Sequence, residues 1–190
     1  MFAMFRFRAA LAALLLAIGT IATQPAIASG FLQCVPFARE ASGVTIFGNA
    51  HTWWDQAAGR YERGSEPRIG AVIAFPGTRA MPIGHVGVVS RIISPREILM
   101  DHANWSWRGQ IERDVRVIDV SPNNDWSMAR VWYGRINGLG IRPNPVSGFI
   151  YPAELAPRYA ARVGESGTQL ASYVPDASGD LAAIVASVGR

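Results

Sequence analysis

The sequence predicts an α+β domain in which helices near the N-terminus pack on one face of an antiparallel β-sheet. Two observations favour this fold class. Apolar residues recur at helical spacing between residues 34 and 58, whereas residues 71–133 contain short runs rich in Val and Ile that are separated by turn residues. Helices that come first and are followed by strands in succession are typical of segregated α+β folds, not of alternating βαβ units.

The first predicted helix begins at about Cys34 and ends before Gly43. Pro36 suits the first turn, where its missing N–H would have no partner, and Gly43 can adopt the left-handed conformation that closes a helix. One stripe of this helix is apolar: Cys34, Phe37, Ala38 and Ala41. We therefore expect the thiol to point inward, at a helix N-terminus whose dipole favours the thiolate.

A second short helix is predicted over residues 50–58. Asn49 can cap its start, and Gly59 can end it. Trp53 and Trp54 give this helix an apolar side. The polar residues that follow, up to Arg68, are typical of a loop.

Five apolar runs predict the strands of the sheet: residues 71–75, 85–93, 98–106, 110–120 and 128–133. Pro, Gly, Ser and Asn cluster between these runs, where they favour turns over longer crossovers. Short connections of this kind predict antiparallel pairing of consecutive strands.

The two ends of the chain differ in composition from its centre. Residues 1–28 combine two arginines, an apolar run and a small-x-small motif, so we expect a secretory signal peptide and a periplasmic or secreted protein. We place the folded catalytic domain at residues 29–134. Residues 135–190 are rich in glycine and proline or small and polar, and we expect a C-terminal extension that is partly disordered.

Composition argues against several classes of function. The net charge is +4, and the 18 basic residues are all arginines that are dispersed along the chain, which argues against nucleic acid as a partner. After the predicted signal peptide no apolar run is long enough to span a membrane. Cys34 is the only cysteine, so no internal disulfide can form, and a lone thiol in an exported protein is a candidate for reactivity.

Two neighbouring predicted strands carry polar side chains in apolar surroundings, which needs a reason. His85 begins one strand, and His102 and Asn104 lie in the next. If residues 94–97 form the turn of a hairpin without bulges, His85 faces Ser106. In this register Asn104 is diagonal to His85 and His102 is one step further, and a shift of two residues would bring both closer.

Cys34, His85 and one polar residue of the next strand meet the requirements of nucleophilic catalysis. A cysteine nucleophile needs a base that takes its proton, and the base needs a third group that fixes its tautomer and orientation. His85 is the candidate base, and His102 or Asn104 is the candidate third group. Two alternatives stay open: Cys34 as a small buried hydrophobe, and a zinc site made of Cys34, His85 and His102.

Five features occur together in this sequence: Gln33-Cys34 at the start of a helix, the Trp-bearing segment after it, the strand at Gly70, Gly84-His85-Val86, and the pair Asn104-Trp105. The combination resembles the CHAP family, the cysteine, histidine-dependent amidohydrolases/peptidases, over about residues 31–134. This resemblance implies a papain-like α+β fold. It also implies cleavage of bacterial peptidoglycan, by an N-acetylmuramoyl-L-alanine amidase or a peptide endopeptidase.

The resemblance further implies roles for single residues, without a cofactor or a metal. Cys34 corresponds to the nucleophile and His85 to the general base. His102 stands where the family often has an acid, and the related NlpC-type peptidases use a histidine as third member of the triad. His102 and Asn104 therefore both stay candidates for the group that orients His85. Ala71 stands where the family usually has an aspartate, a position that we interpret as structural.

Peptidoglycan is the partner that this interpretation implies. Trp53, Trp54 and Trp105 are the expected substrate-binding residues, because aromatic faces can stack on sugar or peptide. The alternative function is a catalytically inactive module on the same fold that binds the cell wall or has a structural role.

Overall fold

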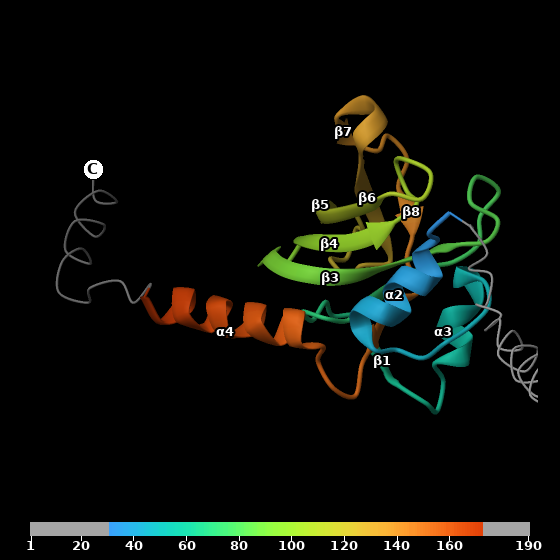
Figure 1. The fold of residues 1–190 in the computed structure, drawn as a ribbon. Coiled ribbons are helices and arrows are strands. Elements are labelled where there is room, and N and C mark those ends of the chain that lie inside the picture. The colour runs from blue at the N-terminus through green and yellow to red at the C-terminus, as the bar shows by residue number, and fades with distance from the viewer. Residues whose placement is uncertain (1–30, 173–190) are drawn as a thin grey trace, which may run out of the picture. The chain divides into compact units, whose positions relative to one another are not determined.

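The computed structural model describes residues 31–172, and Figure 1 shows their fold. The predicted signal peptide, residues 1–28, lies outside the described residues. Within this described part, no helix is both long and apolar enough to cross a membrane.

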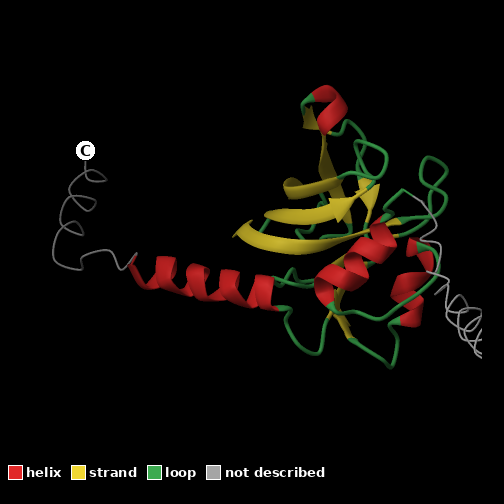
Figure 2. Ribbon diagram, viewed as in Figure 1, coloured by secondary structure: helices red, strands yellow, loops and turns green. Residues whose placement is uncertain are grey.

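An antiparallel sheet dominates this part of the chain (Figure 2). Within residues 31–172 it has nine strands: β1 (Glu62–Gly64), β2 (Val72–Phe75), β3 (His85–Ser94), β4 (Glu97–Ala103), β5 (Ile111–Asp119), β6 (Met128–Tyr133), β7 (Gly138–Leu139), β8 (Asn144–Pro145) and β9 (Gly148–Tyr151). Their order in space is β1-β9-β2-β3-β4-β5-β6-β7, and β8 pairs with β6. The five strands expected from the sequence correspond to β2 to β6.

The helices of the described residues are short, apart from the last one: α2 (Cys34–Ser42), η1 (Ala50–Thr52), α3 (Trp53–Gln56), η2 (Gly134–Ile136) and α4 (Pro157–Ser172). Helix α2 packs on β3 and β4, as can be followed in Figure 1. The predicted α+β class, with N-terminal helices packed on an antiparallel sheet, agrees with this arrangement.

Two apolar clusters lie on the two faces of the sheet. The first joins α2 and η1 to the sheet and includes Ala38, Val86 and Val88, while the second draws on β2 to β6 and on β9. In the second cluster Trp126 and Phe149 make an edge contact, with ring centroids 5.7 Å apart. Because Trp126 precedes β6 and Phe149 lies in β9, which are far apart in the strand order, the sheet must curve around this cluster.

The sheet continues past residue 134, where the sequence placed the end of the domain. Strand β9 lies between β1 and β2, and Phe149 and Ile150 are fully buried in it. Gly148 explains why the glycine-rich composition misled the prediction: a Cβ at this position would come within 2.6 Å of the Trp54 ring. This glycine permits close packing of a strand and does not mark a flexible tail. The expected disorder beyond residue 172 falls outside the described residues and stays a prediction.

A buried carboxylate holds the start of α4 on the sheet. Asp101 of β4 is fully buried, and its Oδ2 accepts a hydrogen bond from the Tyr159 hydroxyl at 3.1 Å and pairs with Arg158 at 2.9 Å. Its Oδ1 accepts the backbone N–H of Asp114 at 2.9 Å. Both oxygens are therefore satisfied, as a buried charge requires.

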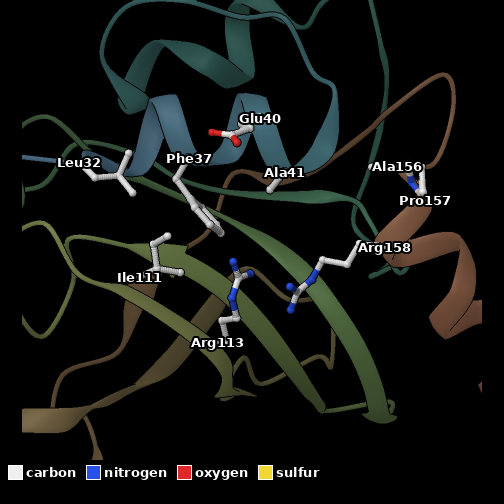
Figure 3. A pocket seen from close by; sticks show the side chains of 9 residues that line it. All are labelled: Leu32, Phe37, Glu40, Ala41, Ile111, Arg113, Ala156, Pro157 and Arg158. Atoms are coloured by element: carbon white, nitrogen blue, oxygen red, sulfur yellow. The ribbon is translucent and has the colours of Figure 1, made fainter. Parts of the chain in front are cut away.

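A cavity lies beside this anchor, between α2, β5 and the start of α4. Phe37, Arg113 and Arg158 line it, and Figure 3 shows their side chains extending toward one another from three different elements. Arg113 also pairs with Asp101, at 3.4 Å. The two arginines at this cavity are thus tied to the same carboxylate, and the cavity marks the junction of α4 with the rest of the domain.

Replacing Tyr159 by Phe is expected to lower the free energy of unfolding by about 2 kcal/mol, because the buried Asp101 carboxylate loses a hydrogen-bond donor. Hydrogen bonds to charged groups contribute more to stability than bonds between neutral groups. Urea denaturation of the purified protein measures the change. Tyr61→Phe is the control, since its hydroxyl bonds Thr45 in an exposed setting and should cost less than about 1 kcal/mol. Equal losses in the two variants would contradict the anchoring role of Tyr159.

Candidate active site

Cys34 is the first residue of α2 and faces the protein interior, as the helical pattern predicted. Its side chain is buried, with 7% of the residue exposed. The helix ends at Gly43, which has a left-handed φ of 78° and donates its N–H to the Arg39 carbonyl at 2.9 Å. Pro36 in the first turn and Gly43 after the last one thus bound the helix as the sequence predicted, and the thiol lies at the start of a helix that packs on β3.

His85 begins β3 and is also buried. The preceding Gly84 has a left-handed φ of 70°, and a Cβ there would come within 2.6 Å of the backbone of His51 and of Phe75. The His51 N–H donates to the Ile83 carbonyl at 2.9 Å, so η1 is fastened to the segment that leads into His85. Glycine is thus required to bring this segment close to its neighbours.

A hydrogen bond joins His85 to His102. His85 Nε2 lies 3.0 Å from His102 Nδ1, and the two rings meet edge to face with centroids 5.1 Å apart. Two register shifts in the β3–β4 hairpin bring the residues together: Ser94 pairs with Glu97, but Val88 pairs with Asp101. Relative to a hairpin without bulges, the register at this end has moved by two residues, the shift that would bring His102 closer to His85.

Asn104 does not contact His85 through a hydrogen bond in this structure. Its Nδ2 donates to Gln33 Oε1 at 2.8 Å, and its Oδ1 accepts the Gly109 N–H at 2.8 Å. Asn104 also has a left-handed φ of 62°. It therefore links the loop after β4 to the residue that precedes Cys34, and His102 is the partner of the candidate base.

The three tryptophans expected to bind substrate have different surroundings. Trp105 lies against His85, with ring centroids 4.7 Å apart, and donates from Nε1 to the Trp132 carbonyl. Trp53 is fully buried in the core, so it cannot stack on a ligand, and Trp54 is half-buried beneath Arg63. The expectation that Trp53 binds substrate is therefore wrong. The apolar side of a short helix has the same sequence pattern whether it packs on the core or contacts a ligand.

A cavity of about 310 Å³ brings the candidate residues together. Cys34, His85, Asn104 and Trp105 all line it. The remaining lining residues come from the segment before β3, the end of β6 and nearby loops: Gln33, Ala80, Met81, Ile83, Gly84, Tyr133 and Asn144. Trp53 and Trp54 are not among them. A thiol and an imidazole that share one cavity can both reach the same bound molecule.

Burial keeps the thiol and both imidazoles neutral at pH 7. It lowers the pKa of His85 to about 3 and lowers the pKa of His102 well below its ordinary value, and repulsion between the two rings when both carry a proton adds to the effect on His102. Burial also raises the pKa of the Cys34 thiol, although backbone hydrogen bonds with Val86 and Val35 act in the opposite direction. The resting site is therefore a neutral thiol beside neutral imidazoles.

The buried histidines should make the stability of the fold sensitive to mild acid. Their folded-state pKa values lie below the unfolded value of 6.5, so the unfolded chain binds more protons than the folded chain as the pH falls from about 6.5. We expect the free energy of unfolding to be about 2 to 4 kcal/mol smaller at pH 5 than at pH 7. Urea denaturation at the two pH values measures it, and His85→Gln should remove about half of the difference. An unchanged difference in this variant would show that other groups cause it.

Glu112 of β5 lies near His102 Nε2, and no motif in the sequence marks it as a site residue. The Glu112 Oε2 atom is 3.7 Å from that nitrogen and accepts the Ser106 N–H at 2.8 Å. His102 and Glu112 are paired residues of β4 and β5, next to a register shift between Met100 and His102. The sequence places the turn at residues 107–109, but the loop runs over residues 104–110 and Ala103 pairs with Ile111, which sets Glu112 opposite His102.

A thiol at a helix start and an imidazole on the adjoining strand open into one cavity, which is an arrangement that nucleophilic catalysis can use. In a comparison with protein-family models, residues 25–104 match the CHAP domain. This part of the chain therefore belongs to the CHAP family, and the family indicates a hydrolase of the amidase or peptidase kind that acts on peptidoglycan. No curated protein matches the chain. The family match includes Cys34, His85, His102 and Asn104 but ends before Glu112.

Proposed function

We propose that this protein is an exported cysteine amidohydrolase or peptidase that cleaves amide bonds of bacterial peptidoglycan through a thioester intermediate, on a papain-like fold. The observation that carries the proposal is the cavity in which Cys34 and His85 meet, with His85 Nε2 bonded to His102. Export is inferred from the composition of residues 1–28.

The hydrogen bond to His102 determines which nitrogen of His85 serves as base. Because Nε2 of His85 is engaged with His102 Nδ1, its Nδ1 is left for Cys34. Nδ1 can accept a proton only if the neutral ring carries its own proton on Nε2, which then donates to His102. His102 orients His85 in this scheme, and Asn104 positions the residue before the nucleophile.

The reaction follows in two halves. His85 Nδ1 takes the thiol proton as Cys34 Sγ attacks the carbonyl carbon of a stem-peptide or muramyl amide, and backbone N–H groups at the start of α2 stabilise the oxyanion. The C–N bond breaks, and the His85 imidazolium gives its proton to the leaving amine. His85 then takes a proton from water, which attacks the thioester, and the thiol leaves as the carboxylate forms.

The alternative zinc site has little support in the arrangement of its ligands. His85 Nε2 and His102 Nδ1 point at each other across a hydrogen bond, so these two nitrogens cannot both face one ion. Within residues 31–172, no group of three or more His, Cys, Asp or Glu side chains is arranged to hold a metal ion.

Digestion of purified peptidoglycan tests the proposal. The mature chain, residues 29–190, is incubated with the wall, and the released fragments are identified by mass. New amino termini at the muramyl-linked alanine would indicate an amidase, and cleavage between peptide residues would indicate an endopeptidase. If the protein sediments with the wall but releases nothing, the inactive binding module is the better description. Parallel reactions with a chelator and with a thiol reagent separate zinc chemistry from thiol chemistry.

A further inference from the structure

His102 has one buried nitrogen that the His85 bond does not use. Its Nε2 is fully buried and has no hydrogen-bond partner among the described residues. Buried polar groups in folded proteins are nearly always paired, and an unpaired one costs about 1 to 3 kcal/mol. The nitrogen therefore calls for an acceptor nearby.

Glu112 is the carboxylate that can supply this acceptor. Its Oε2 lies 3.7 Å from His102 Nε2, longer than a hydrogen bond, and its side chain is only 14% exposed. The Ser106 N–H holds the same oxygen at 2.8 Å. Since His102 and Glu112 are partners in the β4–β5 register, their side chains lie on the same face of the sheet, and a small rotation of the carboxylate closes the remaining gap.

We propose that Glu112 is a positioning residue that completes a chain from carboxylate to thiol. Its carboxylate accepts the Nε2 proton of His102, which leaves His102 Nδ1 without a proton. That nitrogen accepts the Nε2 proton of His85, and His85 Nδ1 is then free to take the proton of Cys34. This inference rests on the proposed function, and it adds a residue that lies outside the segment matched to the CHAP domain.

The consequence of losing Glu112 follows from the tautomers. Without an acceptor, His102 can move its proton to Nδ1, and this nitrogen then donates to His85 Nε2. His85 must carry its own proton on Nδ1 in that state, and it cannot act as a base toward Cys34. A carboxylate two groups away from the thiol thus controls whether the base is available.

Few titratable groups face His102. His85 of β3 lies on one side, with Cys34 of α2 beyond it at the cavity, and Glu112 of β5 lies on the other. The neighbouring Asp101 is engaged with Tyr159 and the arginines near α4. A change in the protonation of His102 can therefore be assigned to Glu112 when that residue alone is replaced.

Two variants separate the positioning role from a merely structural one. Glu112→Met keeps the length of the side chain but removes every acceptor, whereas Glu112→Gln keeps a neutral oxygen for the Ser106 N–H and for His102. Glu97→Gln is the matched control, because it removes a carboxylate of β4 that pairs with Arg116 and not with a histidine. Each protein is made as the mature chain, and its thermal unfolding is recorded.

The first readout does not depend on activity. Long-range ¹H–¹⁵N spectra of the imidazoles should show His102 protonated on Nε2 in the wild type and a mixture of tautomers in Glu112→Met. The rate of Cys34 alkylation by iodoacetamide at pH 7 should fall about tenfold in Glu112→Met, because the base is lost in part of the molecules. Glu97→Gln should leave both unchanged.

The second readout is turnover of a muropeptide substrate. Replacing the orienting carboxylate of a Ser-His-Asp triad lowers kcat about 10⁴-fold, and an intervening imidazole should make the effect smaller here. We expect kcat to fall about 10- to 100-fold in Glu112→Met, with KM within about twofold, and partial retention in Glu112→Gln. Failure of the proposed function would show as no turnover in any protein, while the spectra would still report on Glu112.

Two results would overturn the proposal. One is a wild-type spectrum in which His102 carries its proton on Nδ1. The other is a folded Glu112→Met protein in which the tautomer of His102 and the alkylation rate of Cys34 both match the wild type. Glu112 would then serve only to hold the Ser106 loop.

Discussion

Replacing Cys34 by Ala is expected to abolish the release of fragments from peptidoglycan, with a loss of about 10⁴-fold or more in kcat. The thiol is the only side chain of its kind in the sequence, and it shares its cavity with His85. No other nucleophile at this position can form the acyl intermediate. The rate of fragment release from purified wall, measured by mass, gives the comparison with the wild type.

The Cys34→Ala variant should lose activity because it lacks the nucleophile, and it should still fold. Cys34 is buried but small, so the change to Ala leaves only a small cavity and should cost less than about 2 kcal/mol of stability. Thermal unfolding and sedimentation with the wall should therefore stay close to those of the wild type. Retention of more than a tenth of the wild-type rate by a folded Ala variant would rule out Cys34 as the nucleophile.

Ending the chain at Gly134 is expected to prevent folding. The truncation removes β9 from its place between β1 and β2, together with the core residues Phe149, Ile150 and Tyr159. Each large apolar side chain contributes about 1.5 to 3 kcal/mol by its burial, and whole domains have only about 5 to 15 kcal/mol of net stability. The truncation also removes β7 and β8, so four strand pairings are lost, those of β9 with β1 and β2 and those of β6 with β7 and β8. Together with the three side chains, this loss should exceed that margin.

A chain that ends at residue 172 is the matched control, because it keeps every element that the structure describes. It should unfold cooperatively in urea, whereas the chain that ends at residue 134 should give no transition and should be digested rapidly by protease. Cooperative unfolding of the shorter chain would mean that the domain is complete at residue 134, as the composition suggested.

Local signals explain why much of the fold could be predicted. Pro36 and Gly43 mark the ends of α2, and the inward stripe follows from its helical period. Strands β2 to β6 are rich in Val and Ile and are bounded by turns, so their limits differ from the expected ones by at most a few residues. These features depend on neighbours in the sequence, which a single sequence displays directly.

The missed features depend on contacts between distant segments. Strand β9 has only four residues, begins with Gly148 and is followed by Pro152, and only its place between two other strands makes it a strand. Bulges in the β3–β4 register bring His102 within reach of His85, whereas Asn104 lies past the end of β4 and bonds Gln33 and Gly109 instead. A bulge adds one residue without a distinctive sequence, so the pairing across it has to be seen in three dimensions.

The central claim, that Cys34 carries the reaction, is tested most directly by titrating the thiol against activity. The chain has a single cysteine, so alkylation with iodoacetamide can be counted by the intact mass of the protein while the same samples digest peptidoglycan. Our account predicts that activity falls in proportion to the modified fraction and reaches zero at one alkyl group per chain. Substantial activity in fully alkylated protein would contradict it.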